Sequence, residues 1–290
     1  MINIERISTI KNALGEGPVW DAGLQSLFWL DSFKGQIFCL GASGEIQLWP
    51  MPCMIGSLAI VDDSRAIVAL QTGFHFFNFV TNELTSVADP EAEIIETRFN
   101  DGKTDRAGNF VAGSMGIKIR DRALAHLYRV NSDLSIEVLD DDVIVSNGPC
   151  FSPEGDILYF NDGRRRMLAY DYVPDKPLTN KRVFFEGAAH NTGSDGATVD
   201  KEGNVWTALT GSSEVGCISP QGKILERIPM PIKLPSSVMF GGPELNELYV
   251  TSISNSGNRT SDEEGAGGLY KITGLGATGI AEPRFNCITL

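Results

Sequence analysis

Short apolar runs separated by turn residues follow one another along almost the whole chain. In residues 147–162, for example, an Asn-Gly pair is followed by an apolar run, a Gly turn and a second apolar run. Such runs, bounded by Gly, Asp or Ser, predict short β-strands. No stretch has the pattern of a long amphipathic helix. The chain is therefore expected to be all-β.

The same succession recurs six times at a long period. The residues that open the first strand of each unit are Glu16, Ile55, Asn100, Asn147, Asp195 and Ser236, spaced 39 to 48 residues apart. Six units of about four short strands are typical of a β-propeller, and a β-sandwich has no such period. We therefore predict a single six-bladed β-propeller of four-stranded antiparallel blades over residues 1–290.

The sixth unit contains only three clear strands, within residues 236–241, 247–253 and 267–272. Residues 2–10 alternate in part between apolar and polar side chains, as a strand does. We expect them to close the ring as the fourth strand of the last blade. This closure would remove the exposed edge between the first and last blades.

Composition narrows the classes of function. The formal charge of −13 gives no support for binding a phosphate backbone, so we expect no nucleic-acid partner. Five scattered cysteines without a C-x-x-C pair predict reduced, mostly buried thiols. No apolar stretch approaches the length of a membrane span, and no basic leader precedes an apolar run. We expect no membrane association and a cytoplasmic location.

The residues that open the inner strands of a propeller meet at one mouth of the central channel. Four of the six carry carboxylate or amide oxygens, and Asp101 adjoins one of them. Oxygen ligands without Cys or His suit a hard divalent cation, calcium or magnesium first and manganese next. Asn-Gly and Asp-Gly pairs also begin tight turns in many β proteins. Their coincidence at one phase of the repeat favours a metal site.

Six separated motifs stand at or near these positions. They are residues 14–20 (LGEGPVW), 98–103 (RFNDGK), 146–148 (SNG), 151–155 (FSPEG), 194–196 with 200–206, and 238–243 (VMFGGP). Together they resemble the gluconolactonase/regucalcin (senescence marker protein) family over nearly the whole chain. The resemblance implies a six-bladed propeller that hydrolyses sugar lactones at one divalent ion, with calcium expected and Mg²⁺, Mn²⁺, Zn²⁺ or Fe²⁺ as alternatives.

Carried over motif by motif, the resemblance also implies roles for individual residues. The metal ligands would be Glu16, Asn147 and Asp195, while Arg98 and Asn100 would contact substrate and Asp101 would support the site. Asp195, or Asp101 close by, is the candidate general base, although a metal-bound carboxylate is a weak one. His190 lies with Asn191 in the loop before Asp195, and we interpret it as a residue that borders the pocket.

Three stretches depart from the family's pattern. Thr104-Asp105-Arg106 stands where relatives often have Cys-x-Pro, and Val111 replaces an aromatic residue. Residues 116–120 (GIKIR) stand where relatives often place an acidic substrate contact. There, Lys118 or Arg120 would favour an anionic substrate, or the stretch is a solvated strand edge. Arg164-Arg165-Arg166 is interpreted as a solvated turn.

Three functions follow as alternatives. The first is metal-dependent hydrolysis of a sugar lactone to the aldonic acid by a monomer or weak homo-oligomer. The second is hydrolysis of organophosphorus esters by a propeller resembling diisopropyl fluorophosphatase. The third is a calcium-binding or ligand-binding propeller without turnover. Serine chemistry has little support, because Ser114 and Ser194 lack the first Gly of a nucleophile elbow.

Overall fold

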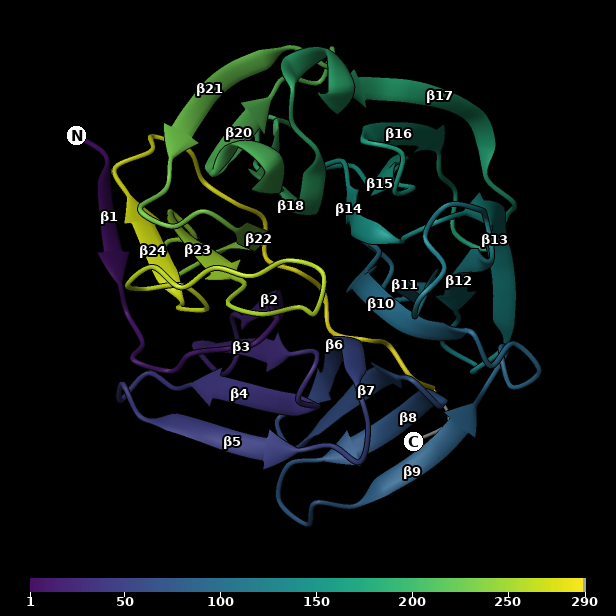
Figure 1. Cartoon of the computed structure of the whole chain (residues 1–290). Coiled ribbons are helices and arrows are strands. Elements are labelled where there is room, and N and C mark those ends of the chain that lie inside the picture. The colour runs from purple at the N-terminus through teal and green to yellow at the C-terminus, as the bar shows by residue number, and fades with distance from the viewer. Residues whose placement is uncertain (289–290) are drawn as a thin grey trace.

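The predicted strands fold into a ring of six separate four-stranded antiparallel sheets, as the computed structural model shows for residues 1–288 (Figure 1). In blades 1 to 5, consecutive strands of the chain are hydrogen-bonded neighbours and the first is innermost in the ring. In blade 6, β22 (Pro235–Gly241) is innermost and β1 (Asn3–Arg6) is outermost. The prediction of an all-β, six-bladed propeller is therefore confirmed.

Blades 1 to 3 follow one another in chain order. Blade 1 consists of β2 (Gly15–Asp21), β3 (Ser26–Asp31), β4 (Gln36–Leu40) and β5 (Ile46–Pro50). Blade 2 consists of β6 (Ile55–Asp62), β7 (Arg65–Leu70), β8 (Gly73–Asn78) and β9 (Leu84–Ala88). Blade 3 consists of β10 (Thr97–Thr104), β11 (Phe110–Gly116), β12 (Ala125–Val130) and β13 (Ile136–Val143).

The second half of the ring repeats this arrangement. Blade 4 consists of β14 (Asn147–Phe151), β15 (Ile157–Asn161), β16 (Arg166–Asp171) and β17 (Thr179–Glu186). Blade 5 consists of β18 (Ser194–Val199), β19 (Val205–Leu209), β20 (Glu214–Ile218) and β21 (Ile224–Pro229). Blade 6 consists of β22 (Pro235–Gly241), β23 (Glu247–Ser252), β24 (Tyr270–Thr273) and β1 (Asn3–Arg6). Two single-turn 3₁₀ helices, η1 (Gly187–His190) and η2 (Thr210–Ser212), follow β17 and β19.

The N-terminal strand closes the ring, as expected. β1 pairs antiparallel with β24, and the register places Asn3 opposite Thr273 and Arg6 opposite Tyr270. The last blade is thereby assembled from both ends of the chain, which ties blade 6 to blade 1 without leaving an unpaired edge between them.

Burial decreases from the axis outward within each blade. Every residue of β10 and β22 is buried, whereas β5 and β9 are exposed or half-buried along their length. Inner strands pack against neighbouring blades on both faces, so even polar residues such as Arg98 and Lys103 of β10 are buried there. Outer strands cover only one face, and their sequences alternate.

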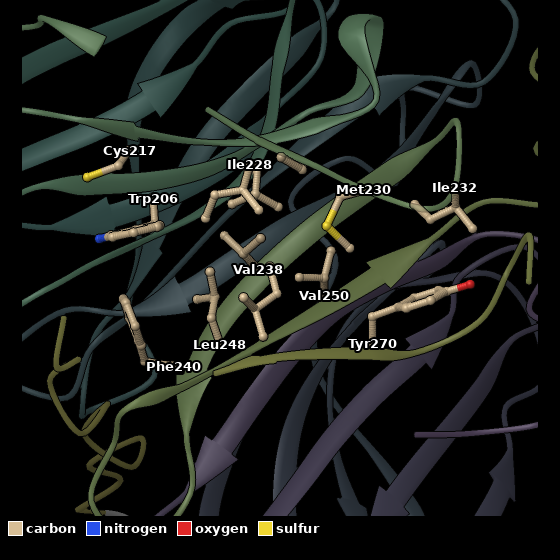
Figure 2. Packing of buried hydrophobic residues seen from close by; sticks show 13 residues of the cluster. Trp206, Cys217, Ile228, Met230, Ile232, Val238, Phe240, Leu248, Val250 and Tyr270 are labelled. Carbon is tan, nitrogen blue, oxygen red and sulfur yellow. The ribbon is translucent and has the colours of Figure 1, made fainter. Parts of the chain in front are cut away.

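The hydrophobic core consists of six clusters, each lying between two adjacent blades. Figure 2 shows the cluster between blades 5 and 6, in which Trp206 of β19 faces Phe240 of β22 and Val238 packs near Leu248. The Trp206 and Phe240 rings meet edge to face, with centroids 5.7 Å apart. Large side chains from each sheet thus fill the wedge between blades.

A C-terminal strap, residues 277–288, crosses the end of the ring at which the inner strands finish (Figure 1, yellow). Its backbone hydrogen-bonds to Leu245 of blade 6, Ile60 of blade 2 and Ser132 of blade 3. Phe285 of the strap is buried between blades 2 and 3. The strap covers this end of the channel, and the residues predicted to form the site lie at the other end.

Two further observations bear on expectations from the sequence. Among residues 1–288, no helix has the length and apolar character needed to cross a membrane. Cys39, Cys150 and Cys217 are buried. Burial raises the pKa of each of these three thiols, which keeps them protonated at neutral pH.

Replacing the buried strap residue tests whether the strap holds the ring together. We expect Phe285→Ala to lower the free energy of unfolding by about 3 to 5 kcal/mol, because a fully buried ring is removed and a cavity remains. Val80 is 75% exposed, so the control Val80→Ala should change stability by less than about 0.5 kcal/mol. Urea unfolding measures both, and equal values for the two variants would show that the strap contributes no packing.

Candidate functional site

Each inner strand contains a β-bulge close to the residue predicted to open it. The pairing register slips by one residue between Glu16 and Val19 in β2, between Asn147 and Cys150 in β14, and between Ser194 and Ala197 in β18. The other three inner strands slip at corresponding places. A bulge bends its strand and redirects the side chains beside it. The Asn-Gly and Asp-Gly pairs at these positions therefore lie within strands, and the alternative that they begin tight turns is wrong.

A glycine follows four of the six positions, Glu16, Ile55, Asn147 and Asp195, and allows neighbouring inner strands to approach one another. A Cβ on Gly148 would lie 2.5 Å from the backbone oxygen of Asp195 in the next blade. Gly56 packs in the same way on the backbone of Asn100, and Gly196 on Ser237. Gly148 also has a φ of +55°, which an L side chain rarely adopts. Only glycine permits this blade-to-blade contact around the channel.

Most of the predicted site residues line one cavity at this mouth of the channel. It has a volume of about 750 Å³, and its walls include Glu16, Arg98, Asn100, Asn147 and Asp195. These residues come from blades 1, 3, 4 and 5. The repeat phase thus brings together side chains that are up to 179 residues apart in the sequence.

A chain of hydrogen bonds fixes the amides in the wall. Arg98 Nη1 donates to Asn100 Oδ1 at 2.9 Å and to the Phe99 carbonyl at 2.8 Å. Asn100 Nδ2 in turn donates to Asn147 Oδ1 at 2.6 Å and to the Ser146 carbonyl at 2.7 Å. A carbonyl oxygen has two lone pairs, so Asn147 Oδ1 keeps one for a further partner. Arg98 and Asn100 therefore orient the amide oxygen of Asn147.

Asp101 lies behind the wall and joins two blades. Its Oδ2 accepts a hydrogen bond from Gly148 N–H at 2.8 Å, and its Oδ1 accepts one from Gly102 N–H at 2.9 Å. Burial raises the pKa of this carboxyl. The charge of Lys103 and the two hydrogen bonds lower the pKa, but the effect of burial is larger. Asp101 is not among the residues that line the cavity. Its contacts suit the supporting position that the family resemblance implies.

The carboxylates of the site repel one another in a buried space. Burial raises the pKa of Glu16 well above its ordinary value, and the charges of Asp195 and Asp101 raise it further. Burial raises the pKa of Asp195 to about 6, with Asp101 adding to the effect and Arg259 opposing it. The positive charges of Arg98 and Arg259 offset part of this repulsion at Glu16. A further positive charge bound at the site would therefore reduce the repulsion between its carboxylates.

The donor set fits a hard divalent cation. Two carboxylates and one oriented amide oxygen are ligands of the type that Ca²⁺ and Mg²⁺ prefer. No group of three His, Cys, Asp or Glu side chains among residues 1–288 is arranged to hold an ion. Glu16 and Asp195 would therefore need a third donor of another type to hold a cation, and the oriented amide oxygen of Asn147 would supply it, with water or substrate completing the shell.

Comparison with known proteins identifies the family of this chain. Residues 14–254 match the family described as the SMP-30/Gluconolactonase/LRE-like region. The chain belongs to this family. It is 32% identical to L-arabinolactonase of Azospirillum brasilense, over 96% of this chain and 94% of the relative. It is also 32% identical to 6-deoxy-6-sulfogluconolactonase of Pseudomonas putida, over 94% and 95% of the two chains.

A solved structure of the family has the same fold. The calcium-binding protein regucalcin of Agrobacterium tumefaciens superposes with a TM-score of 0.89 and 26% identity, covering 97% of this chain and 96% of that one. The family resemblance drawn from the sequence motifs is thus confirmed. Two of these relatives are named as lactonases and one as a calcium-binding protein.

Two predicted substrate contacts lie outside the cavity wall. Lys118 is exposed and does not line the cavity, although Arg120 of the same stretch does. His190 is exposed at the end of η1, where its ring stacks on Phe185 with centroids 5.2 Å apart, while Asn191 beside it lines the cavity. In both cases the residue that reaches the site is one or two positions further along the chain.

Several cavity residues come from loops that carry no repeat signal. Arg259 Nη1 lies 3.6 Å from Asp195 Oδ2, and Thr210 Oγ1 donates to the same oxygen at 3.3 Å. Arg165 and Arg166, interpreted from the sequence as part of a solvated turn, also line the cavity. Charge and spacing give no signal for Arg259, because the loop that carries it joins β23 to β24 without strand periodicity.

The three stretches that depart from the family's pattern differ in whether they reach the site. Thr104 and Arg106 lie at the strap end, where Thr104 Oγ1 donates to the Pro283 carbonyl and Arg106 pairs with Glu282 at 3.1 Å. Val111 is fully buried in the core between blades 3 and 4. Neither change reaches the cavity. Only the stretch that includes Arg120 alters its wall.

The close approach at Gly148 can be tested against a matched glycine. We expect Gly148→Ala to lower the free energy of unfolding by at least about 3 kcal/mol, because the new Cβ adds a clash with Asp195 to backbone strain. Gly44 also has a positive φ but nothing within 4 Å of its Cβ position, so Gly44→Ala should cost only about 1 to 2 kcal/mol. Denaturant titration compares them. The interpretation fails if the two losses are the same.

Proposed function

We propose that this protein hydrolyses a sugar lactone to the aldonic acid with one divalent cation held by Glu16, Asn147 and Asp195. The observation that carries the proposal is the convergence of these three side chains, from blades 1, 4 and 5, on one cavity. Membership of the family and the lactonase names of two relatives support it. Those names include both an arabinolactone and a sulfonated gluconolactone, so the family alone does not fix the sugar.

The cation would polarise the lactone carbonyl and lower the pKa of a bound water. The chain's own residues supply the remaining requirements of the reaction. Arg98 is buried in the wall, and although burial lowers its pKa to about 10 it remains a cation at neutral pH. Its guanidinium is suited to hold a substrate oxygen and to stabilise the negative charge that develops on the carbonyl oxygen. Asn100 aligns both Arg98 and Asn147 for this purpose.

Asp195 is the residue best placed to accept a proton from the attacking water. It lines the cavity, and burial raises the pKa of this carboxyl, which offsets in part the weakening that a bound cation would cause in a carboxylate base. The water oxygen adds to the carbonyl carbon, the ring C–O bond breaks, and the proton passes to the leaving ring oxygen. Thr210 and Arg259 hold the Asp195 carboxylate in place by contacting its Oδ2.

A non-catalytic calcium-binding role is the second candidate. It is favoured by the structural relative described as a calcium-binding protein. The same three oxygen donors would serve either role. Only a measurement of turnover distinguishes a lactone hydrolase from a non-catalytic calcium-binding protein.

A lactone panel tested with and without chelator distinguishes these functions. We expect protein stripped of divalent ions to lose at least about 100-fold in kcat/KM for its best sugar lactone, because carbonyl polarisation is lost. Adding back Ca²⁺, Mg²⁺, Mn²⁺, Zn²⁺ or Fe²⁺ one at a time should restore it with at least one ion. Acid release in a pH-stat is the measurement.

Each other result selects a different conclusion. Full activity in stripped protein would contradict the role of the cation. Cleavage of a fluorophosphate ester without cleavage of any lactone would favour an organophosphorus-ester hydrolase. Calorimetric binding of Ca²⁺ without turnover of either class would leave the non-catalytic role.

Asp195→Asn tests the proposed ligand set with little change of shape. We expect the Kd for the cation to rise at least about 100-fold and kcat/KM to fall by about 10³, because the ligand set loses a charge and the reaction loses its base. Calorimetry and steady-state kinetics measure the two effects. Cation-free Asp195→Asn should be no less stable than the parent, because the folded state disfavours this buried charge.

Asp141 supplies the matched control, since it is exposed on β13 and its replacement makes the same change of charge. Asp141→Asn should leave the cation Kd and kcat/KM within about twofold of the parent. If Asp195→Asn behaves as Asp141→Asn does, Asp195 is neither a ligand nor the base.

A further inference from the structure

Basic side chains concentrate in the cavity of an otherwise acidic protein. The chain has a formal charge of −13, yet only two acidic residues, Glu16 and Asp195, line the cavity. The basic residues in its wall are Arg98, Arg120, Arg165, Arg166, Lys233 and Arg259. A concave site lined mainly by one sign of charge attracts ligands of the opposite sign.

Several of these charges are already compensated by carboxylates. Arg166 lies 2.8 Å from Asp162, and Lys233 lies 3.5 Å from Glu263. Arg259 in turn lies 3.6 Å from Asp195. Arg120 differs from these three, as Arg98 and Arg165 do, because no carboxylate of residues 1–288 lies within 4.0 Å of its guanidinium. Its positive charge is thus directed to the cavity without a partner of opposite sign in the described chain.

Arg120 and Arg259 line the same cavity although they come from opposite sides of the ring. Arg120 belongs to the loop of residues 117–124 in blade 3, and Arg259 to the loop of residues 253–269 in blade 6, which extends over the ring in Figure 1. Asn258 joins the two loops. With its amide turned so that the oxygen faces blade 3, it accepts a hydrogen bond from Arg120 Nη1 at 3.0 Å.

The two guanidinium groups lie within each other's electric field. Burial lowers the pKa of Arg120, and the positive charge of Arg259 lowers it further. The charge of Arg120 in turn contributes to the lowered pKa of Arg98. Three like charges are thus held around one opening, and an anion placed between them would relieve their repulsion.

We propose that Arg120 and Arg259 form a subsite for an oxyanion substituent on the lactone substrate. The inference rests on the proposed lactonase function and deepens it by assigning a substrate class: a sugar lactone that bears a phosphate, sulfonate or carboxylate group. Guanidinium groups suit this task, because their planar N–H pairs match two oxygens of such a group. Arg259 lies beside Asp195, so a substituent bound there sits next to the reacting end of the site.

Binding of analogues that cannot be hydrolysed tests the subsite without relying on turnover. The probes are 1,5-anhydroglucitol, which has the ring but no lactone carbonyl, and its derivatives with a phosphate, a sulfonate or a carboxylate at carbon 6. We expect the Kd of the best anionic derivative for Ca²⁺-loaded protein to be at least about 20-fold lower than that of 1,5-anhydroglucitol at low salt. Isothermal titration calorimetry measures the four values, and their order identifies the anion.

Arg120 variants separate the subsite from other sources of attraction. In Arg120→Gln the anionic advantage should fall below about threefold, and Arg120→Lys, which keeps the charge, should retain part of it. Arg182 is the control, because it lies on β17 paired with Asp171 and outside the cavity. Arg182→Gln should keep the full advantage. The sulfonate is the most informative probe, since it is a weaker ligand of divalent cations than phosphate.

The proposal is overturned if neutral and anionic analogues bind equally, or if Arg120→Gln leaves the advantage intact. In kinetics, the ratio of kcat/KM for an anionic lactone to that for the matching neutral lactone should fall in Arg120→Gln as the binding ratio does. If no lactone is hydrolysed but the analogues show an advantage that depends on Arg120, the lactonase proposal fails and the subsite stands. If lactones are hydrolysed with a ratio near one, the reverse holds.

Discussion

The close contact between neighbouring inner strands is the constraint on which the site depends. At Gly148 the backbone of blade 4 comes so near to Asp195 of blade 5 that no side chain fits between them. Asp101 strengthens the same approach from blade 3 by accepting the Gly148 N–H. Because the strands converge here, side chains placed beside the bulges reach one another across the channel. With wider spacing, Glu16, Asn147 and Asp195 would belong to three separate surfaces.

This convergence is costly in electrostatic terms. Burial raises the pKa of Glu16, Asp101 and Asp195, and the negative charges of the two aspartates raise the pKa of Glu16 further. Packing in the rest of the ring offsets this electrostatic destabilisation. The six clusters between blades, the closing strand β1 and the C-terminal strap stabilise the fold away from the site. Such a division, with strain at the site and packing around it, is common in proteins that bind ions or perform catalysis.

The sequence predicted the scaffold and the floor of the site because both follow the repeat. Glu16, Asn147 and Asp195 occupy one phase of a long period, so placing the strands also places these side chains. The same logic does not distinguish a turn from a bulge, since an Asn-Gly pair suits both. It also fails beyond the strand ends. β11 ends at Gly116, and past that point alternation no longer tells whether Lys118 or Arg120 faces the cavity.

The site therefore has two parts with different structural origins. Its floor is built from bulged inner strands that are locked by contacts between blades, so a change there disturbs both fold and chemistry. Its rim is built from loops, and the loops of blades 3 and 6 meet above the floor through Arg120, Asn258 and Arg259. Loops tolerate substitution better than packed strands do. It follows that the rim of the cavity can vary in this fold, while the floor with its carboxylates and hydrogen-bonded amides remains the same.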